Sequence, residues 1–367
     1  ILKYKALQKN TSSIVGKSTI FGVMPDWNPA EIIGTNPFNL SFDLYKYLIT
    51  DDVWARQRSE YGYRDVRPQP LLVSFAGHPY VDVRASFNSF VPATIDNELA
   101  GRFVDYYIDT LKRSPHYHDK VEFEVVPTCY AFDFENWREK LLSAEFSNSE
   151  IDKLRDGLRG ITQNAISRTV NDLEDVNVVK ERFDDIFSSD LSQLDKAFSL
   201  LEDCRNYGTL VFAHLARSAF ISITLLRTAV SSKIISQAAM DSFLNSIETV
   251  AHEFINDAKK VAQNEKSWSL FISRYGHLRP GTYDITSEAY SHNIDKFLKP
   301  VVKQAKLSKQ GDKKDNNCWL DERKYLVAAL AKLGIKGDLD TIENFLRKAI
   351  EGREYAKFIF SRNLSAA

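Results

Sequence analysis

The sequence predicts a mainly helical protein with a smaller α+β part at its N-terminal end. Residues 1–145 are rich in Pro, Gly and aromatic side chains, and their apolar runs are short. Pro is then absent from Glu135 through Leu278, where long amphipathic stretches follow one another. Hydrophobic residues make up 44% of the chain and charged residues 26%, which is typical of globular proteins. We therefore expect a helical bundle over residues 146–367, packed on a short-stranded sheet region.

Two helices are predicted in the N-terminal part. Apolar residues recur at helical spacing over residues 41–58. A second helix is expected over residues 96–111, with Asp96 as its N-cap and an apolar side formed by Leu99, Phe103 and Tyr107.

Three β-strands are predicted in the same part. The runs 71–75 and 80–83 are short and β-like, and His78-Pro79 is expected to form the turn between them, because the residue before Pro avoids the helical region. Residues 121–126, VEFEVV, alternate with a period of two, which predicts a half-buried strand.

The remainder is predicted to consist of antiparallel helices joined by short breaks. The charged stretch 309–317 is expected to be an exposed loop. The expected helices span residues 149–170, 178–204, 208–231, 237–263, 265–275, 318–333 and 338–362.

Composition excludes several classes of protein. The formal net charge of −1 predicts neither a nucleic-acid surface nor an anionic-membrane surface. The most apolar stretch, residues 209–230, is interrupted by His214, Arg217 and Arg227, so no membrane span is expected. The 3 cysteines are scattered, which argues against a disulfide framework or a zinc site and favours the reducing cytoplasm.

Complete catalytic motifs are absent from the sequence. It contains no G-x-x-x-x-G-K-[ST] phosphate loop, no G-x-G-x-x-G and no G-x-S-x-G. His116-x-His118 is interpreted as a solvated turn rather than a metal site. We expect no metal and no cofactor bound by these residues themselves.

Segment 22–34, GVMPDWNPAEIIG, is one of four segments that carry more functional residue types than folding requires. Its Pro and Gly residues fix a loop that projects Asp26, Asn28 and Glu31 beside Trp27. Asn28 before Pro29 also reads as a helix N-cap, which is a purely structural alternative for that one residue.

Segment 54–67 interleaves arginines with tyrosines. Arg56 and Arg64 are candidates for binding a carboxylate or phosphate. Arg58 and Arg67 are interpreted as solvated residues of a helix end, where arginines pair with Glu60 and Asp65.

Segment 80–90, YVDVRASFNSF, alternates polar and apolar residues. We expect a strand whose polar face presents Asp82, Arg84, Ser86 and Asn88 to an amino-acid-like ligand.

The last segment is 275–287, YGHLRPGTYDITS. Its glycines and Pro280 form a tight loop from which four side chains are expected to be exposed. These are His277, Arg279, Tyr283 and Asp284. A structural alternative is that Arg279 and Asp284 satisfy one another.

One helix adds two further candidates. His214 and Arg217 lie three residues apart and share a face of the predicted helix 208–231. Because the helix is largely apolar, both must be paired or line a cavity, and a satisfied core histidine is the favoured reading of His214.

These segments resemble the dikinase-like enzymes related to phosphoenolpyruvate synthase. Segment 275–287 is similar to the tyrosine–glycine–histidine, arginine, proline–glycine, acidic pattern in the middle domain of rifampicin phosphotransferases. Segments 22–34, 61–64, 81–90, 212–217 and 276–286 look like a subgroup of phosphoenolpyruvate-synthase-like proteins of surface-polysaccharide clusters. That subgroup includes L-glutamine kinases of capsular phosphoramidate synthesis.

The resemblance implies a three-part phosphotransferase. An ATP-grasp domain before Ile1 would use ATP and Mg to phosphorylate a histidine on a swivelling domain after Ala367. The present chain would be the internal region that binds the small-molecule acceptor, with both ends cut from a longer polypeptide; a processed or trimmed chain is the plainer alternative. None of the 7 histidines has the context of the phosphocarrier.

The roles follow from the chemistry of an acceptor such as L-glutamine. Arginines would take its carboxylate, carboxylates its ammonium group, and His277 or a carboxylate would act as the base. The predicted catalytic residues are His277, Arg279 and Asp284. The predicted substrate-binding residues are Asp26, Asn28, Glu31, Arg56, Arg64, Arg84, Asn88, His214, Arg217 and Tyr283.

Two alternatives remain open. The chain can be a non-catalytic helical spacer that sets the swing of the carrier domain, or part of a related synthase with another acceptor. A standalone hydrolase that uses Asp26, Glu31 or Asp284 is a third possibility. In the leading interpretation, segment 275–287 forms one wall of an acceptor pocket and faces the segments of Asp26, Arg56 and Arg84.

Overall fold

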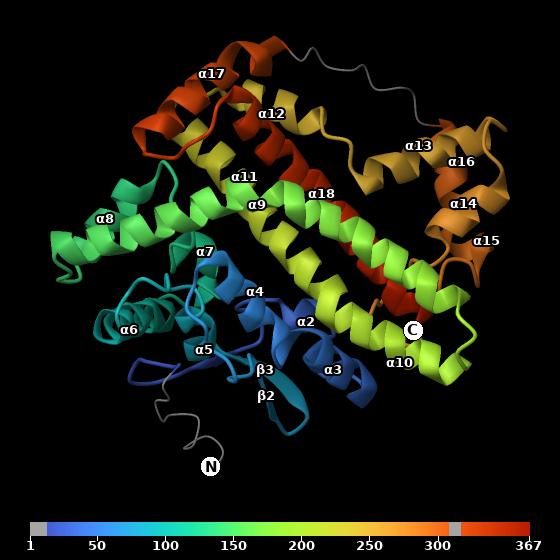
Figure 1. Cartoon of the computed structure of the whole chain (residues 1–367), viewed down its shortest axis with the longest axis horizontal. Coiled ribbons are helices and arrows are strands. Elements are labelled where there is room, and N and C mark those ends of the chain that lie inside the picture. Colours follow the sequence, from blue (N-terminus) through green and yellow to red (C-terminus); the bar gives the residue numbers. More distant parts are fainter. Residues whose placement is uncertain (1–12, 308–316) are drawn as a thin grey trace. The chain divides into compact units, whose positions relative to one another are not determined.

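The computed structural model describes residues 13–307 and 317–367 (Figure 1). It confirms the predicted fold class, because helices dominate and one small antiparallel sheet lies in the N-terminal part. The chain divides into two compact units. Unit 1 ends at Ser167 and also includes Lys332–Lys336, while unit 2 comprises Arg168–Ala331 and Gly337–Ala367. The division thus falls inside a helix and not at residue 145. Most of the predicted loop 309–317 lies outside the described residues.

Unit 1 combines the sheet with short helices. In chain order its elements are β1 (Phe21–Gly22), α2 (Pro29–Ile32), α3 (Asn39–Tyr45), the π-helix η1 (Lys46–Thr50), α4 (Val53–Tyr61), β2 (Leu72–Phe75), β3 (His78–Asp82), α5 (Val83–Asn88), α6 (Asn97–Arg113), the 3₁₀ helix η2 (Pro115–Tyr117), α7 (Val121–Glu124), α8 (Phe134–Leu142) and the first part of α9 (Asn148–Ser188).

The sheet has the strand order β1-β3-β2 and is antiparallel throughout. Leu72 pairs with Val81, and Phe75 pairs with His78. The predicted strands are confirmed, but the turn is not at His78-Pro79. Ala76 and Gly77 form it with φ of 51° and 83°, the positive values that a two-residue hairpin turn needs.

The predicted strand at residues 121–126 is wrong. Val121–Glu124 forms the short helix α7, and both Val121 and Val125 are buried because one helical turn brings residues four apart onto one face. The predicted helix 41–58 is also interrupted, since α3 and η1 end before Asp51 and α4 begins at Val53.

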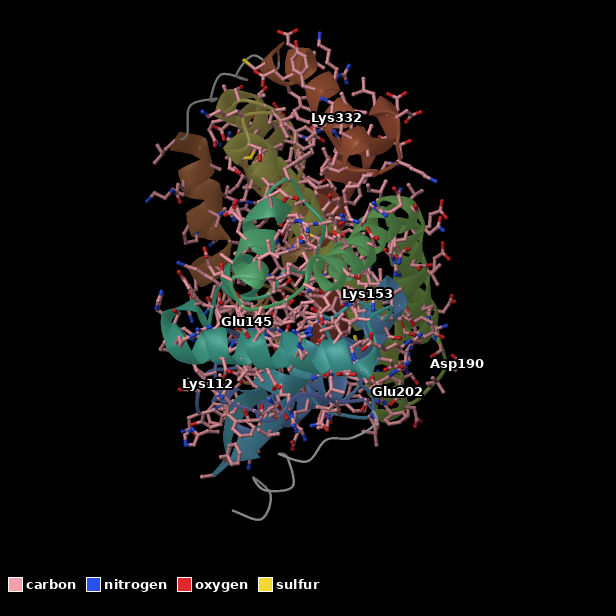
Figure 2. The ribbon with its side chains drawn as sticks, turned by 90° about the vertical axis from the view of Figure 1, so that its left-hand side faces the viewer. Lys112, Glu145, Lys153, Asp190, Glu202 and Lys332 are labelled. Carbon is pink, nitrogen blue, oxygen red and sulfur yellow. The ribbon has the colours of Figure 1, made fainter. Side chains whose placement is uncertain are left out.

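Helix α6 confirms its prediction, including its start. Asp96 Oδ1 accepts a hydrogen bond from Leu99 N at 2.9 Å, and the apolar side of the helix is buried. The Phe103 and Phe146 rings stack with centroids 4.6 Å apart. Charged residues such as Lys112 and Lys153 lie exposed on the outer faces of unit 1 (Figure 2).

Residues 332–336 return to unit 1 and bind α9. Gln163 Nε2 donates to Lys336 O at 3.1 Å, and Lys336 N donates to Gln163 Oε1 at 2.7 Å. Ile335 is 2% exposed. One side-chain amide thus pairs with both polar groups of a distant peptide segment.

Unit 2 is helical in the residues that the structure describes. Its elements are the second part of α9, then α10 (Gln193–Asp203), the π-helix η3 (Cys204–Gly208), α11 (Thr209–Ser231), α12 (Gln237–Asn245), α13 (Val250–Ala262), α14 (Trp268–Tyr275), α15 (Ile294–Phe297), α16 (Lys299–Leu307), α17 (Asn317–Lys332) and α18 (Leu339–Ala366).

Two predicted helix boundaries in unit 2 are wrong. The expected break at residues 171–177 does not exist, because α9 continues through them. The expected single helix 237–263 is divided between α12 and α13, where Thr249 Oγ1 caps α13 by accepting from His252 N at 3.3 Å.

Unit 2 contains two apolar clusters. The first joins α9, α11 and α18 through buried residues that include Val179, Leu215 and Ile359. Figure 1 shows α11 and α18 running along one another. The second joins α13, α14 and α16 through Phe271, Tyr275 and Leu298, and Phe358 of α18 packs against both clusters.

One helical stretch among the described residues, Gln193–Ser231, is long and apolar enough to cross a membrane by length and composition alone. However, 72% of its most apolar window is buried inside the structure. A core helix of a globular protein has the same properties.

Candidate functional site

The segment 22–34 contains the most unusual backbone of unit 1. Asp26, Trp27 and Asn28 are consecutive and have φ of 67°, 53° and 41°. This left-handed conformation costs a non-glycine residue about 1–2 kcal/mol, so the surrounding structure must hold it. Tyr45 contributes by donating from its hydroxyl to Trp27 O at 2.5 Å.

A buried ion pair holds the first residue of this left-handed turn. The two Arg58 Nη atoms donate to the two Asp26 oxygens at 2.5 Å and 2.8 Å, and Ser86 Oγ donates to Asp26 Oδ2 at 2.7 Å. Ser89 Oγ accepts from Arg58 Nη1. The Arg58 and Asp26 side chains are 2% and 3% exposed. Arg58 is therefore not the solvated helix-end residue that the sequence suggested.

The remaining polar residues of segment 22–34 are accessible. Trp27 and Asn28 are half-buried and Glu31 is exposed. Asn28 occupies the N-cap position of α2, as predicted, yet its side chain makes no capping bond and instead donates from Nδ2 to Glu31 Oε2 at 3.4 Å. The structural alternative thus accounts for the position of Asn28 but not for its amide.

Segment 80–90 is not a strand with one polar face. It changes from β3 to α5 at Asp82, whose carboxylate accepts from the Ala85 main chain and from Thr19 Oγ1. Burial raises the pKa of Asp82. The N-cap explains the miss, because a polar residue at a strand-to-helix junction continues the period-two pattern by coincidence.

Arg84 and Asn88 bind the main chain of an earlier segment. Arg84 Nη1 donates to Gly16 O at 3.1 Å. The Asn88 amide donates to Val15 O at 2.9 Å and accepts from Val15 N at 3.0 Å. Both side chains are buried, so these contacts fix residues 15 and 16 against α5.

Arg56 and Arg64 lie nearer the surface. Arg56 Nε donates to Glu60 Oε1 at 2.9 Å, with both side chains more than one-third exposed. Arg64 Nη2 donates to Asn97 Oδ1 at 2.8 Å, and burial lowers the pKa of Arg64. Exposed contacts of this kind contribute about 0–1 kcal/mol, which leaves both arginines able to exchange partners.

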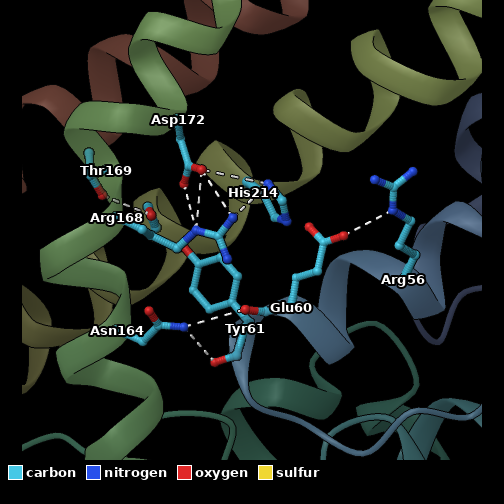
Figure 3. A network of polar contacts seen from close by, with 9 residues as sticks. Arg56, Glu60, Tyr61, Asn164, Arg168, Thr169, Asp172 and His214 are labelled. Atoms are coloured by element: carbon cyan, nitrogen blue, oxygen red, sulfur yellow. Dashed lines mark hydrogen bonds and ion pairs between the residues drawn. The ribbon is translucent and has the colours of Figure 1, made fainter.

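His214 and Arg217 lie on α11 and are 4% and 7% exposed. Figure 3 shows His214 beside Arg168 and Asp172 of α9. Arg168 Nε and Asp172 Oδ2 lie 2.9 Å apart, and Arg168 Nη2 lies 2.9 Å from His214 Nδ1. Because arginine only donates, Nδ1 accepts and the ring proton sits on Nε2. This is the paired core histidine that the sequence favoured.

Segment 275–287 turns its polar residues inward. Tyr283 is 9% exposed, and His277, Arg279 and Asp284 are all half-buried, so the expected exposure is wrong. Burial and the neighbouring Cys204 raise the pKa of Tyr283.

Arg279 and Asp284 are bonded to different partners. Arg279 Nη2 donates to Ser365 Oγ at 2.8 Å, whereas Asp284 Oδ1 accepts from Thr286 N at 2.9 Å and from Thr286 Oγ1 at 2.7 Å. The alternative in which these two residues satisfy one another is therefore not observed. Instead Asp284 closes a local turn, and Arg279 reaches the end of α18.

His277 packs against α18, with its ring centroid 4.6 Å from that of Phe358. Burial, and then the positive charge of Arg362, lower the pKa of His277 to about 4. The imidazole is therefore neutral at pH 7. Hydrogen bonds with the main chain of Phe358 and Arg274 favour the protonated form but do not outweigh burial.

The structure brings some predicted residues together within each unit. Asp26 meets Arg58 and Ser86 in unit 1, and His277 and Arg279 meet α18 in unit 2. Sequence reasoning missed Arg58 and Arg362. Arg58 follows Trp54 by one turn on a helix whose Val53 and Tyr61 are buried, which is the signal that could have identified it.

No metal centre is formed by the described residues, since no group of three His, Cys, Asp or Glu side chains is suitably arranged in them. Comparison of the chain with known protein families, with curated proteins and with solved structures finds no match.

Proposed function

We propose that this chain is the acceptor-binding part of an ATP-dependent phosphotransferase of the phosphohistidine-carrier type. The acceptor is L-glutamine or a similar small amide or amino acid used in surface-polysaccharide modification, and the full enzyme works in the cytoplasm with ATP and Mg. The proposal begins with the sequence resemblance. It is supported by the way in which segments 22–34, 54–67 and 80–90 each contribute to the buried network around Asp26.

The strained turn at Asp26, Trp27 and Asn28 carries the proposal. Three successive left-handed residues are stabilised by a buried ion pair and by a tyrosine hydroxyl, which is more support than a plain surface loop needs. Strain that the surroundings maintain is a recognised property of ligand-binding segments. The turn presents the Trp27 ring, the Asn28 amide and the Glu31 carboxylate on its accessible side.

These groups suit an amino-acid amide. Glu31 is proposed to bind the ammonium group, Asn28 the side-chain amide, and Trp27 the apolar stem of the acceptor. Arg56 or Arg64 would bind the acceptor carboxylate, since each now makes only an exchangeable contact. His277, Arg279 and Asp284 keep their proposed roles in phosphoryl transfer.

Calorimetric titration of the 367-residue chain with L-glutamine tests acceptor binding. We expect Glu31→Gln and Trp27→Ala each to weaken binding about tenfold, the scale of one charge-assisted hydrogen bond. Glu98→Gln, an exposed glutamate on α6, is the matched control and should bind as the wild type does. Binding unchanged in both turn variants would exclude this site.

Transfer itself is tested in the longer polypeptide. There Arg279→Ala and Asp284→Ala should abolish the acceptor phosphoramidate signal in ³¹P NMR while the carrier histidine is still phosphorylated by ATP. Normal product formation in both variants would show that segment 275–287 has no part in transfer.

One observation favours the second candidate, a non-catalytic spacer. Arg84 and Asn88, two of the predicted ligand-binding residues, are committed to the main chain at Val15 and Gly16. A spacer predicts no amino-acid binding by the chain, and the wild-type titration therefore separates the two candidates.

A further inference from the structure

The last turns of α18 face three side chains that carry unused nitrogen atoms. In residues 13–307 and 317–367, the atoms His277 Nε2, Arg279 Nε and Arg362 Nη2 are buried and have no hydrogen-bond partner. Buried polar groups are nearly always bonded, so a group of three in one place needs a cause.

The three side chains lie on one face of α18. His277 stacks on Phe358, and Arg279 bonds to Ser365. Phe358, Arg362 and Ser365 follow one another at four- and three-residue spacing, which places them on the same side of a helix. Arg362 is also close enough to depress the protonation of His277.

The charge of this group is not neutralised nearby. Within the described residues, neither Arg279 nor Arg362 has a carboxylate within ion-pair distance; Asp184 of α9 attracts Arg362 without pairing with it. Arg362 instead lies over the Phe183 ring at 4.1 Å and donates from Nε to Asn363 Oδ1 at 3.0 Å. Asp284, on the same loop as Arg279, is occupied by Thr286. Two guanidinium groups therefore share a partly buried region without a counter-charge.

His277 supplies a different kind of group. Its main-chain hydrogen bonds must come from Nδ1, because Nε2 has no partner in the described residues. A neutral imidazole that donates from Nδ1 has a lone pair on Nε2, and this nitrogen can only accept. The region thus combines two cationic donors with one acceptor.

We propose that Arg279, Arg362 and His277 form a binding site for a tetrahedral oxyanion that carries a proton, with hydrogen phosphate as its simplest member. The guanidinium groups donate to the anionic oxygens, and Nε2 of His277 accepts from the hydroxyl group. A carboxylate or a sulfate at neutral pH has no such proton. The site goes beyond the proposed function because it needs no acceptor; only its link to phosphoryl transfer rests on that function.

Calorimetric titration of the 367-residue chain at pH 7.5 with inorganic phosphate, and separately with sulfate, tests the site. We expect phosphate to bind and sulfate to bind at least about tenfold more weakly, since sulfate leaves the acceptor facing an oxygen without a proton. Arg362→Gln should weaken phosphate binding about tenfold or more. His277→Leu should remove the preference for phosphate over sulfate.

Two controls make the result decisive. Arg353→Gln changes an exposed arginine of the same helix and should bind phosphate normally. Circular dichroism and thermal unfolding identify any variant that fails to fold, and Arg279→Lys, which keeps the charge but loses the planar fork, then serves as a milder test. L-glutamine binding should persist in Arg362→Gln, so failure of this site and failure of the acceptor site give different results.

No phosphate binding by the wild type at millimolar concentration would overturn the proposal. An equal loss of binding in Arg353→Gln and Arg362→Gln would do the same, because it would indicate diffuse electrostatic attraction. Equal affinity for phosphate and sulfate would exclude the protonated oxyanion as the ligand class.

Discussion

At the scale of single residues, one buried pair supports much of unit 1. Arg58 and Asp26 are both almost fully buried, and each satisfies the other with additional bonds to Ser86 and Ser89. Such a pair adds little net stability over apolar residues of the same shape, but the loss of one partner leaves a buried charge unpaired. The pair therefore determines the conformation of the turn.

We predict that Arg58→Met destabilises the chain by about 3–5 kcal/mol, because Asp26 is left buried and unpaired. Arg56→Met, on the same helix but at an exposed pair, should cost about 0–1 kcal/mol. Urea unfolding followed by circular dichroism measures both. The double variant Asp26→Asn/Arg58→Met should be less destabilised than Arg58→Met alone; a strictly additive result contradicts the coupling.

His277 makes stability depend on pH in a defined direction. Its pKa in the folded chain is about 4, below the ordinary value of 6.5, because burial and Arg362 disfavour the imidazolium. Between these two values the unfolded chain binds more protons, so stability is fully present above pH 6.5 and falls as the pH is lowered to about 4.

We therefore expect His277→Asn to flatten the loss of stability between pH 6.5 and 4. His116→Asn, on an exposed turn, is the matched control and should retain the wild-type slope. Midpoints of urea unfolding at several pH values provide the measurement. A slope that is the same in all three proteins would rule out the burial effect.

At the scale of elements, glycine positions distinguish tightly packed from open helix faces. A Cβ atom on Gly352 of α18 would lie 2.7 Å from Leu173 Cδ2 and 3.1 Å from Leu215 Cδ2. A Cβ atom on Gly160 of α9 would meet nothing within 4 Å. The close approach of α9, α11 and α18 thus requires a residue without a side chain at position 352.

The substitution Gly352→Ala should destabilise the chain by about 1–3 kcal/mol through overpacking. The same change at Gly160 should stabilise it by about 0.5–1 kcal/mol, because alanine restricts the unfolded chain and favours the helix. Thermal unfolding of the two variants measures the opposite signs. A gain in stability at position 352 would show that the three helices are not as close as described.

The end of α11 provides another element-scale test. Lys233 follows the helix with φ of 57°, and Ile234 N donates to Ala229 O at 2.8 Å, the geometry of a left-handed helix end where glycine is preferred. Lys233→Gly should raise stability by up to about 1 kcal/mol, whereas Lys233→Ala should not. Chemical unfolding curves for the pair would decide; an equal effect of both substitutions contradicts the strain at this position.

At the scale of the whole molecule, the sequence predicted the helical class and most helices, because amphipathic spacing and caps such as Asp96 are local signals. It failed where a residue is determined by distant partners. The strand predicted at residues 121–126 became α7 because Val121 and Val125 are buried on one helical face, and period-two alternation over six residues does not exclude that arrangement.

The candidate sites show the same limit. The sequence identified Asp26, His277 and Arg279 through their unusual local context, but it could not find their partners. Arg58 lies far from Asp26 along the chain, and Arg362 lies far from His277, so only tertiary structure reveals either relation. Whether Asp26, Arg56 and Arg84 face segment 275–287 stays a prediction, because these residues belong to different units.

The return of residues 332–336 to unit 1 has a consequence for biosynthesis. Gln163 receives its partner Lys336 only after most of unit 2 has emerged from the ribosome. At about 5–20 residues per second, the intervening chain takes on the order of ten to thirty seconds to translate. During that interval nascent unit 1 exposes the surface that Ile335 later covers. A chaperone that recognises apolar surface would therefore meet unit 1 before its own last segment does.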